Sequence, residues 1–445
     1  MSTLLIRNAT LVNEGKIYHA DVFIKNKFIE KIDTNGIAIP ADRVIDAEGQ
    51  FLLPGVIDDQ VHFREPGLTY KGEIYTEAKA AIAGGVTSFM DQPNTVPNAV
   101  TLDLLEEKYE RASQCSLANY SFFMGTTNKN LNELLKLDET KICGVKIFMG
   151  SSTGDMMVDD PIALENIFKN VRIVIATHCE DDPMVKQNQK KFIEEYGENL
   201  SVKYHGQIRN DEECYKSSSY AVELAKKNDS RLHIFHLSSA KELSLLRNDI
   251  PLNEKRITAE ACIHHLWFSD ADYETKGNFI KWNPAIKTAH DRDEIFKAVL
   301  DGRIDVIATD HAPHTIEEKN QTYLKAPSGG PLIQHSLNAM LEFHHNKKIQ
   351  LEKIVQKMCH NPAILFEIDR RGFIREGFYA DLVLVDLKKE YTVSKENILY
   401  KCNWSPFEGT TFHSVVTTTI VNGHIAFENN QFNESENGMR LKFNR

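Results

Sequence analysis

The chain has 445 residues, of which 42% are hydrophobic and 26% charged, as in an ordinary folded domain and unlike a disordered protein. Its 52 Lys and Arg residues against 63 Asp and Glu residues give a formal net charge of −11. This balance argues against a protein that binds nucleic acid or an anionic membrane mainly through charge. No apolar run reaches the roughly 18 residues of a membrane-spanning helix. The N-terminus has no signal-peptide pattern, and the seven cysteines lie far apart without a C-x-x-C pair, so we expect a cytoplasmic protein without a disulfide framework.

Both ends of the chain read as β structure. Short apolar runs separated by turn residues fill the first fifty residues, and the same pattern returns at 380–386 and 414–421. The Asn422-Gly423 pair that follows is typical of a β-hairpin turn. Two β-rich ends around a different middle favour one small β-sandwich domain built from both termini. Two separate β modules would look alike in sequence.

The middle of the chain alternates apolar strands with helical stretches, which indicates parallel βα units. Eight such units are the number in a (β/α)8 TIM-like barrel. A doubly wound open sheet competes, but no G-x-G-x-x-G follows the first strand. We therefore predict an α/β barrel over residues 54–367, with 1–53 and 368–445 as the two parts of the β domain. The predicted barrel strands are Leu52–Phe63, Thr87–Asn94, Asn119–Gly125, Gly144–Gly150, Arg172–Glu180, Arg231–Ser239, Arg256–Leu266 and Asp305–Pro313.

Several of these strands end in a polar residue that an apolar strand does not need. His62, His178, His236 and Asp310 take such positions. The carboxyl ends of barrel strands converge on one face, so these four side chains should meet there. Imidazole and carboxylate ligands suit Zn²⁺ or a similar divalent ion. A single histidine at a strand end is more often a hydrogen-bonded structural residue, but four at corresponding positions are hard to explain that way.

Lys146 lies inside the apolar strand Gly144–Gly150. A buried lysine must be paired, neutral or chemically changed, unless its ammonium reaches solvent from the strand end. Carbamylation by CO₂ would convert the cation into an anion that can bridge two metals.

Two segments carry a resemblance to a known family. Residues 59–67, DQVHFREPG, and residues 305–314, DVIATDHAPH, resemble the two signatures of dihydroorotases, which are barrel metalloenzymes of the amidohydrolase superfamily. Residues 90–95, 282–287 and 372–386 are similar to further segments of that family. The similarity extends from about residue 54 to residue 386, in the family's order.

The resemblance implies a role for each matching residue. Metal binding falls to His62, His178, His236 and Asp310, with Lys146 as the carboxylated, bridging ligand and Asp155 as the fallback used by some bacterial members. Asp310 is also the implied proton carrier of catalysis. Substrate binding falls to Arg64, Asn94, Asn283 and His314, with backbone contacts from Ser328 and Gly329.

The first ligand of the family's H-x-H pair is Gln60 in this chain. Residues i and i+2 of a strand face the same side, so Gln60 and His62 should both face the site. A glutamine oxygen binds zinc more weakly than imidazole does. Three outcomes stay open: a two-metal site with Gln60 or water as a ligand, a one-metal enzyme, or an inactive relative.

The implied reaction is the reversible cyclisation of N-carbamoyl-L-aspartate to L-dihydroorotate in pyrimidine biosynthesis, by a zinc enzyme that acts on a small molecule and forms a homodimer. One alternative is an allantoinase or dihydropyrimidinase, whose substrates lack the carboxylate that Arg64 would bind. The other is an inactive dihydroorotase-like subunit that scaffolds aspartate transcarbamoylase. His205 lies outside the motifs, and we expect it to be an ordinary surface residue.

Overall fold

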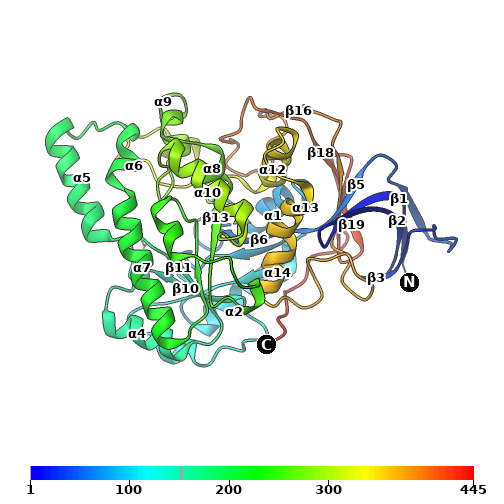
Figure 1. The fold of residues 1–445 in the computed structure, drawn as a ribbon, viewed down its shortest axis with the longest axis horizontal. Coiled ribbons are helices and arrows are strands. Elements are labelled where there is room, and N and C mark those ends of the chain that lie inside the picture. The colour runs from blue at the N-terminus through cyan, green and yellow to red at the C-terminus, as the bar shows by residue number, and fades with distance from the viewer. Residues whose placement is uncertain (1, 151–153) are drawn as a thin grey trace.

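The computed structural model describes residues 2–150 and 154–445. Figure 1 shows a large body of strands surrounded by helices, with a smaller sheet beside it that contains the N-terminal strands.

The middle region forms a closed parallel barrel. Each strand pairs in parallel with the next, and a bridge between Val61 and His311 joins the last strand region to the first. The strands are almost entirely buried, as expected of parallel strands covered by helices. The predicted barrel is confirmed, and each predicted strand overlaps an observed one. The strands are β6 (Val56–Val61), β7 (Val86–Asp91), β8 (Asn119–Phe122) continued by β9 (Met124–Gly125), β10 (Gly144–Phe148), β11 (Val174–His178), β12 (Leu232–Ile234), β13 (Ile257–Cys262) and β14 (Val306–Ala308).

Helices surround the barrel (Figure 1). The longest, α7, has a capping Asn210 side chain that accepts a hydrogen bond from the Glu213 backbone, three acidic residues in its first turn and two lysines in its last. Both ends therefore complement the helix dipole. The α-helices are α1 (Ile74–Ala83), α2 (Leu102–Cys115), α3 (Leu131–Leu134), α4 (Pro161–Asn170), α5 (Asp182–Tyr196), α6 (His205–Ile208), α7 (Asp211–Asn228), α8 (Ile263–Trp267), α9 (Tyr273–Lys276), α10 (Ala289–Asp301), α11 (Ile316–Lys319), α12 (Ser336–His345), α13 (Leu351–Val355) and α14 (Asn361–Leu365).

Shorter helical turns complete the connections. One of them, η8 (Gln356–His360), is a π-helix between α13 and α14. The 3₁₀ turns are η1 (Gly154–Met156), η2 (Val202–Tyr204), η3 (Lys241–Leu245), η4 (Leu252–Glu254), η5 (Asp270–Asp272), η6 (Gly277–Ile280) and η7 (Ile333–His335).

Strands from both ends of the chain form one nine-stranded sheet. β15 lies between β5 and β18 and is antiparallel to both, so the two termini share a single sheet and are not separate modules. A small hairpin of β16 (Tyr391–Thr392) and β17 (Thr411–Phe412) stands apart. The sheet strands are β1 (Thr3–Asn13), β2 (Lys16–Lys25), β3 (Phe28–Asp33), β4 (Arg43–Asp46), β5 (Phe51–Pro54), β15 (Leu382–Asp386), β18 (Val415–Val421), β19 (His424–Glu428) and β20 (Gln431–Phe432).

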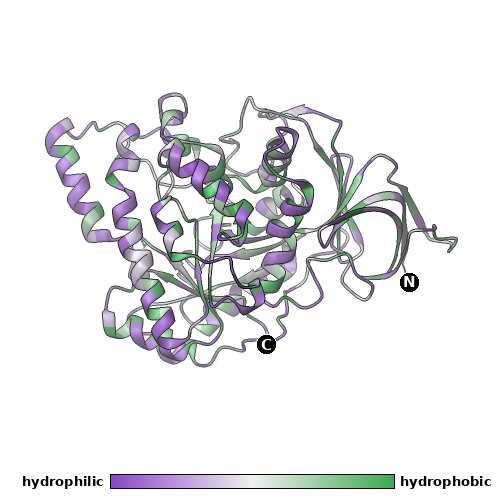
Figure 2. Ribbon diagram, in the orientation of Figure 1, coloured by the Kyte–Doolittle hydropathy of each residue, from purple (hydrophilic) through white to green (hydrophobic). Residues whose placement is uncertain are grey.

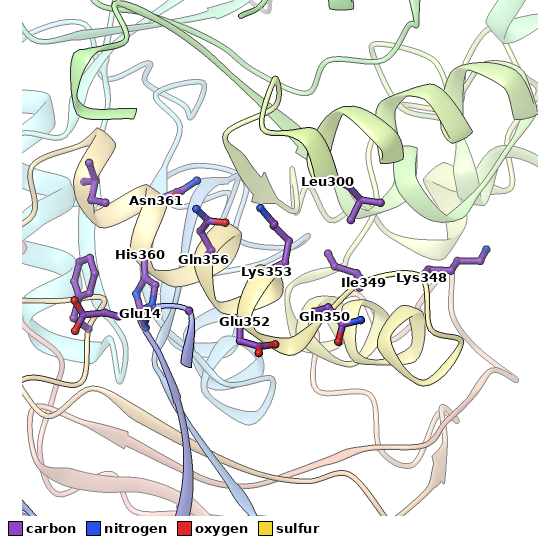
Figure 3. Close-up of a pocket in the computed structure, with 13 residues that line it drawn as sticks. Glu14, Leu300, Lys348, Ile349, Gln350, Glu352, Lys353, Gln356, His360 and Asn361 are labelled. Atoms are coloured by element: carbon purple, nitrogen blue, oxygen red, sulfur yellow. Dashed lines mark hydrogen bonds between the residues drawn. The ribbon is translucent and has the colours of Figure 1, made fainter. Parts of the chain in front are cut away.

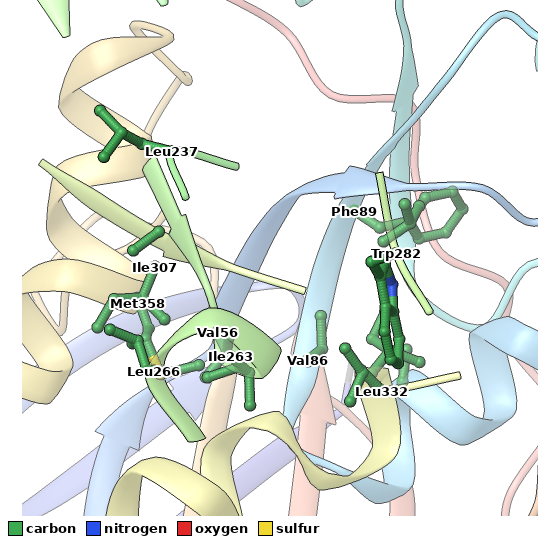
Figure 4. Packing of buried hydrophobic residues seen from close by; sticks show 14 of the residues in the cluster. Val56, Val86, Phe89, Leu237, Ile263, Leu266, Trp282, Ile307, Leu332 and Met358 are labelled. Carbon is green, nitrogen blue, oxygen red and sulfur yellow. The ribbon is translucent and has the colours of Figure 1, made fainter. Parts of the chain in front are cut away.

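The barrel has an outer and an inner apolar layer. Figure 4 shows part of the outer layer, in which Val56 and Ile307 of the strands belong to one cluster with Leu266 of α8. Inside, the rings of Phe123 and Phe235 meet at 5.6 Å although their strands are not neighbours in the sheet. This contact crosses the barrel, so the interior below the strand ends is filled with side chains.

The outer helices carry both hydrophilic and hydrophobic residues along their length (Figure 2), as expected of helices with one face on the barrel. Within residues 2–150 and 154–445, no helix has the length and apolarity that crossing a bilayer would need.

A cavity of about 650 Å³ lies where the turn between β1 and β2 meets α13, η8 and α14. Glu14, Lys353, Gln356 and His360 line it (Figure 3). None of the predicted site residues does.

Candidate metal and substrate site

The residues predicted from the strand ends lie at or just beyond the carboxyl ends of barrel strands, where barrel enzymes place their sites. Gln60 lies in β6 and His62 follows it, Lys146 lies in β10, His178 ends β11, and His236 and Asp310 come two residues after β12 and β14.

Asn94 and Asp310 hold the His62 ring between them. His62 Nδ1 lies 2.7 Å from the Asn94 Oδ1 atom, an acceptor, so Nδ1 donates. The other ring nitrogen, Nε2, lies 3.0 Å from Asp310 Oδ1. A cation, either a proton on Nε2 or a metal ion, is needed between that nitrogen and the carboxylate.

His178 and His236 form a second pair. His178 Nε2 donates to Glu180 Oε2 at 2.9 Å, which leaves the lone pair on Nδ1, 3.0 Å from His236 Nε2. Burial lowers the pKa of His178 and, more strongly, that of His236. Both rings therefore stay neutral, as metal ligands must be.

Lys146 is buried close to both pairs. Its Nζ lies 4.2 Å from the centroid of the Phe235 ring, and no carboxylate of the described residues is within ion-pair distance of it. Burial lowers the pKa of Lys146 to about 7, although the charges of Glu260 and Asp310 raise it. The positive charge of Lys146 in turn helps to lower the pKa of His178 and His236, which links the two pairs electrostatically. The fallback ligand Asp155 is exposed on η1.

Three site residues have a left-handed backbone although none is glycine. The φ angles are 69° at Arg64, 39° at His236 and 49° at Asp310. Such strain persists only where surrounding contacts hold it, and it concentrates at functional sites. At His236 the backbone N–H donates to Glu260 Oε1 at 2.8 Å, which fixes the strained residue.

Gln60, the departure from the family pattern, is buried beside β13. Cys262 Sγ donates to its Oε1 at 3.5 Å, and its Nε2 has no hydrogen-bond partner in the described part of the chain. The neighbouring Asp58 accepts a hydrogen bond from Thr309 Oγ1 at 2.6 Å, which ties β6 to the segment that follows β14.

Arg64, Lys71 and His314 form a buried basic group next to His62. Lys71 Nζ donates to His314 Nδ1 at 3.0 Å, because an ammonium group has no lone pair to accept with. His314 therefore carries its proton on Nε2 and donates it to Ser328 O at 2.9 Å. Arg64 Nη2 lies 3.0 Å from the same Nε2, so two donors face one another.

The loop around Ser328 and Gly329 closes the other side of this group. Ser328 Oγ donates to Asn283 Oδ1 at 2.9 Å. Gly329 has a φ of 119°, and a Cβ there would lie 2.7 Å from Ala312 O, so only glycine fits. Lys319 Nζ donates to Gly329 O at 2.7 Å and anchors the loop from within.

The sequence motifs did not identify the residues that orient the others. Glu180, which holds His178, also accepts from Arg209, and Lys71 pairs with Glu318 at 2.9 Å. Glu180 stands two residues after His178, just past the end of β11 but within the predicted strand Arg172–Glu180. In an extended chain that spacing points both side chains to one side, which could have identified Glu180. Lys71 and Glu318 come from distant segments, and no local pattern links them.

The predicted ligands have the chemistry of a metal site, but among the described residues the structure brings them together as two pairs and not as one group of three or more. One nitrogen of His62 and one of His178 is held by an acceptor, as in metal-binding histidines, which leaves the other nitrogen of each neutral ring with its lone pair. His236 Nδ1 has no hydrogen-bond partner among the residues described. Imidazole and carboxylate are the ligands that zinc sites use.

Comparison with known proteins agrees with this arrangement. Residues 51–426 match the model of the Amidohydrolase family. The dihydroorotase of Methanosarcina acetivorans is 32% identical over 420 residues, covering 92% of this chain and 89% of that protein. The dihydroorotase of Carboxydothermus hydrogenoformans is 33% identical over 434 residues, covering 95% and 96%.

Among solved structures, the L-hydantoinase (dihydropyrimidinase) of Arthrobacter aurescens superimposes with a TM-score of 0.93 at 26% identity, covering 99% of this chain and 100% of that one. The resemblance to dihydroorotases that the motifs predicted is confirmed by the curated relatives. Since the family model spans most of the sequence, the chain belongs to the amidohydrolase family.

Proposed function

We propose that the protein is a dihydroorotase, which catalyses the zinc-dependent, reversible cyclisation of N-carbamoyl-L-aspartate to L-dihydroorotate in de novo pyrimidine biosynthesis. The observation that carries the proposal is the buried Arg64 guanidinium, which faces the Nε2–H donor of His314. The relatives named dihydroorotase support it. We further propose that the enzyme is cytoplasmic and homodimeric.

The buried Arg64 guanidinium, whose Nη2 faces a second donor and no acceptor at His314 Nε2, calls for an anionic acceptor. A carboxylate beside it would accept from the guanidinium as a forked acceptor matched to a forked donor, while the His314 N–H stays with Ser328 O. Both proposed reactants carry such a carboxylate. Asn94 and Asn283, at the edges of the same space, would orient the ring, with the Ser328 and Gly329 backbone at its other side.

The residues that would hold the metal are His62, His178, His236 and Asp310, with Lys146 as a carboxylated bridging ligand. A divalent ion held there acts as a Lewis acid and lowers the pKa of a water molecule. With a pKa of about 7, roughly half of the Lys146 side chains carry a neutral amine at neutral pH. The amine nitrogen can bond to the carbon of CO₂ and release a proton to solvent, which leaves an anionic carbamate.

Asp310 is the proposed proton carrier. In ring opening, water adds to the ring carbonyl and the carbon–nitrogen bond breaks, so one proton must leave the water and one must reach the nitrogen. Asp310 accepts the first and delivers it as the second. Ring closure reverses these transfers.

A hydantoinase or dihydropyrimidinase is the second candidate, since solved structures with those names superimpose on the whole chain. Their name substrates have no carboxylate, and the Arg64 guanidinium would then receive no anionic acceptor from the substrate. An inactive scaffold for aspartate transcarbamoylase is the third, and only Gln60 favours it.

A substrate panel with a matched variant tests the proposal. We expect turnover of dihydroorotate in preference to dihydrouracil, hydantoin and allantoin, and an Arg64→Ala loss of at least 100-fold in kcat/KM, since charged hydrogen bonds are each worth roughly 1.5–3 kcal/mol. Arg303→Ala is the control, because Arg303 pairs with Asp301 at the surface. Preference for an uncharged ring would select the second candidate. No turnover after zinc and bicarbonate are added would select the third.

A further inference from the structure

Three buried side chains from separate strands meet inside the barrel, and none is among the ligands described above. Asp59 lies on β6, His233 on β12 and Glu260 on β13, and each is fully buried. His233 Nε2 lies 3.2 Å from Asp59 Oδ2 and 3.6 Å from Glu260 Oε2. Because β6 and β12 are not neighbours, the contact crosses the interior. We call these three residues the interior cluster.

The neighbours of His233 determine which of its nitrogens carries the proton. Thr258 Oγ1 donates to Leu232 O at 3.2 Å, so it accepts from His233 Nδ1, which lies 2.8 Å away. A neutral ring protonated on Nδ1 has its lone pair on Nε2. That lone pair faces two carboxylates, and three electron-pair donors need a cation among them.

The facing atoms of the interior cluster make no hydrogen bond to any described residue. These atoms are Oδ2 of Asp59, Nε2 of His233 and Oε2 of Glu260. A protonated His233 would donate a straight hydrogen bond to one of the carboxylates, and neither contact has that geometry. Most buried polar atoms have a partner, so three unpartnered atoms that face one another indicate a ligand.

We propose that Asp59, His233 and Glu260 bind a divalent transition-metal ion such as Zn²⁺ at a site separate from the one at the strand ends. Ligand atoms of a tetrahedral zinc site, with bonds of about 2.0–2.1 Å, lie roughly 3.3 Å apart. The two contacts of His233, 3.2 and 3.6 Å, bracket that spacing. A dication with two carboxylates and a neutral imidazole is electrically neutral, which suits a dry interior.

Asp59 of the interior cluster gives β6, the first barrel strand, a carboxylate ligand, whereas Gln60 on the same strand offers only an amide oxygen. Asp59 directly precedes Gln60, and Cys262 Sγ lies 3.5 Å from Gln60 Oε1 and 3.6 Å from Glu260 Oε1. A carboxylate is a better zinc ligand than an amide oxygen. The interior ion would tie three strands together across the barrel and is independent of the proposed reaction.

A proton is the competing cation. Burial lowers the pKa of His233, but Asp59 and Glu260 outweigh this and raise it to about 9. The test must therefore detect the metal itself.

Anomalous diffraction from crystals of the full chain grown with Zn²⁺, recorded above and below the zinc absorption edge, makes that distinction. We expect a zinc peak within bonding distance of His233 Nε2. A map with zinc at the strand ends and none in the interior cluster would overturn the proposal while leaving the proposed function untouched. Interior zinc in a protein without dihydroorotase activity would support the site and count against the reaction.

A pair of variants gives a second measurement. We expect Asp59→Asn to contain one metal equivalent per chain fewer than the parent by elemental analysis, and to show a smaller chelator-induced fall in Tm than the parent. Glu242→Gln is the matched control, because Glu242 is also buried, accepts from Ser239 Oγ at 2.8 Å and is not among the possible metal ligands of the described residues. Equal metal content in Asp59→Asn and the parent would refute the site. Where Asp59→Asn fails to fold, the anomalous map of the parent decides.

Discussion

At the scale of single residues, the site is organised by which nitrogen of each histidine carries a proton. Asn94 Oδ1 accepts a hydrogen bond from His62 Nδ1, and Glu180 Oε2 accepts one from His178 Nε2. Lys71 donates to His314 Nδ1, so the proton of that ring is on Nε2. The partner alone determines the tautomer of each ring, because an amide oxygen or a carboxylate can only accept and an ammonium group can only donate. The positions of the lone pairs, and with them the ability to bind a cation, therefore depend on residues that are not themselves metal ligands.

Glu180→Gln should weaken metal binding at the strand ends by roughly 10- to 100-fold, the usual effect of removing the partner of a metal-binding histidine. The glutamine amide can turn its N–H toward His178 Nε2, so the ring proton is no longer held on Nε2 and the lone pair is no longer held on Nδ1. Competition with a chromophoric chelator measures the affinity. Glu165→Gln, at the surface ion pair with Lys227, is the control, and equal affinities in both variants would contradict the assignment.

Lys71→Met should raise KM for dihydroorotate roughly 10- to 100-fold with little change in kcat, since one charged hydrogen bond is worth about 1.5–3 kcal/mol. Without the ammonium, His314 can move its proton to Nδ1 and lose its fixed donor. Steady-state kinetics separate the two constants, and Lys79→Met, which breaks a surface pair with Glu434, is the comparison. A fall in kcat alone would assign Lys71 a different role.

Carboxylation of Lys146 should depend on pH in the direction set by its lowered pKa. Burial brings that pKa to about 7, so the neutral amine that reacts with CO₂ increases as pH rises. At constant dissolved ¹³CO₂, we expect the initial rate of carbamate formation in the metal-free chain to rise about fivefold from pH 6 to 7 and less than twofold from 7 to 8, because that rate follows the fraction of neutral amine. Carbon NMR follows the adduct, and Lys146→Met should lack it. A continued tenfold rise per unit up to pH 10 would mean an ordinary lysine pKa.

At the scale of elements, the eight barrel strands were predictable because each is a short apolar run that is buried on both faces. The predicted first strand, Leu52–Phe63, proves to be two strands, β5 in the sheet and β6 in the barrel. An apolar run does not show where one sheet ends and another begins. The domain boundaries at 53/54 and 367/368 stay a prediction.

The sequence identifies the predicted metal ligands more readily than the residues that orient them. His62, His178, His236 and Asp310 each interrupt an apolar strand at its end, so a local pattern marks them. The pairings of Asp59 with His233 and of Lys71 with Glu318 join residues more than a hundred positions apart, and no local pattern marks them. The prediction for His205 was wrong: the ring is buried and contacts Tyr323 Oη at 2.9 Å and Trp282 O at 2.7 Å.

Leu52→Ala should lower the free energy of unfolding by about 2–5 kcal/mol, the usual cost of a cavity left by a buried leucine. Leu52 is fully buried in β5 and packs in the core of the sheet formed by both termini. Urea unfolding measures the change. Val44→Ala in β4, where the residue is 44% exposed, should lower the free energy of unfolding far less. Equal losses in the two variants would mean that Leu52 does not lie in a packed core of the sheet formed by both termini.

At the scale of the whole molecule, the terminal sheet and the barrel are not independent parts. Trp404 Nε1, from the segment after β16, donates to His314 O at 2.7 Å, so the C-terminal region reaches the substrate side of the site. Leu441 and Phe443 join the barrel's inner cluster. The site therefore depends on the C-terminal region as well as on the barrel.

The pairing of β5 with β15 affects the order in which the protein can be made. A ribosome releases β5 more than 300 residues before β15, which at roughly 5–20 residues per second is a wait of about 15–65 s. The barrel segment that ends with α14 is complete before β15 emerges and can close first. During that interval the edge of β5 that later pairs with β15 is unpaired and open to pairing with another chain.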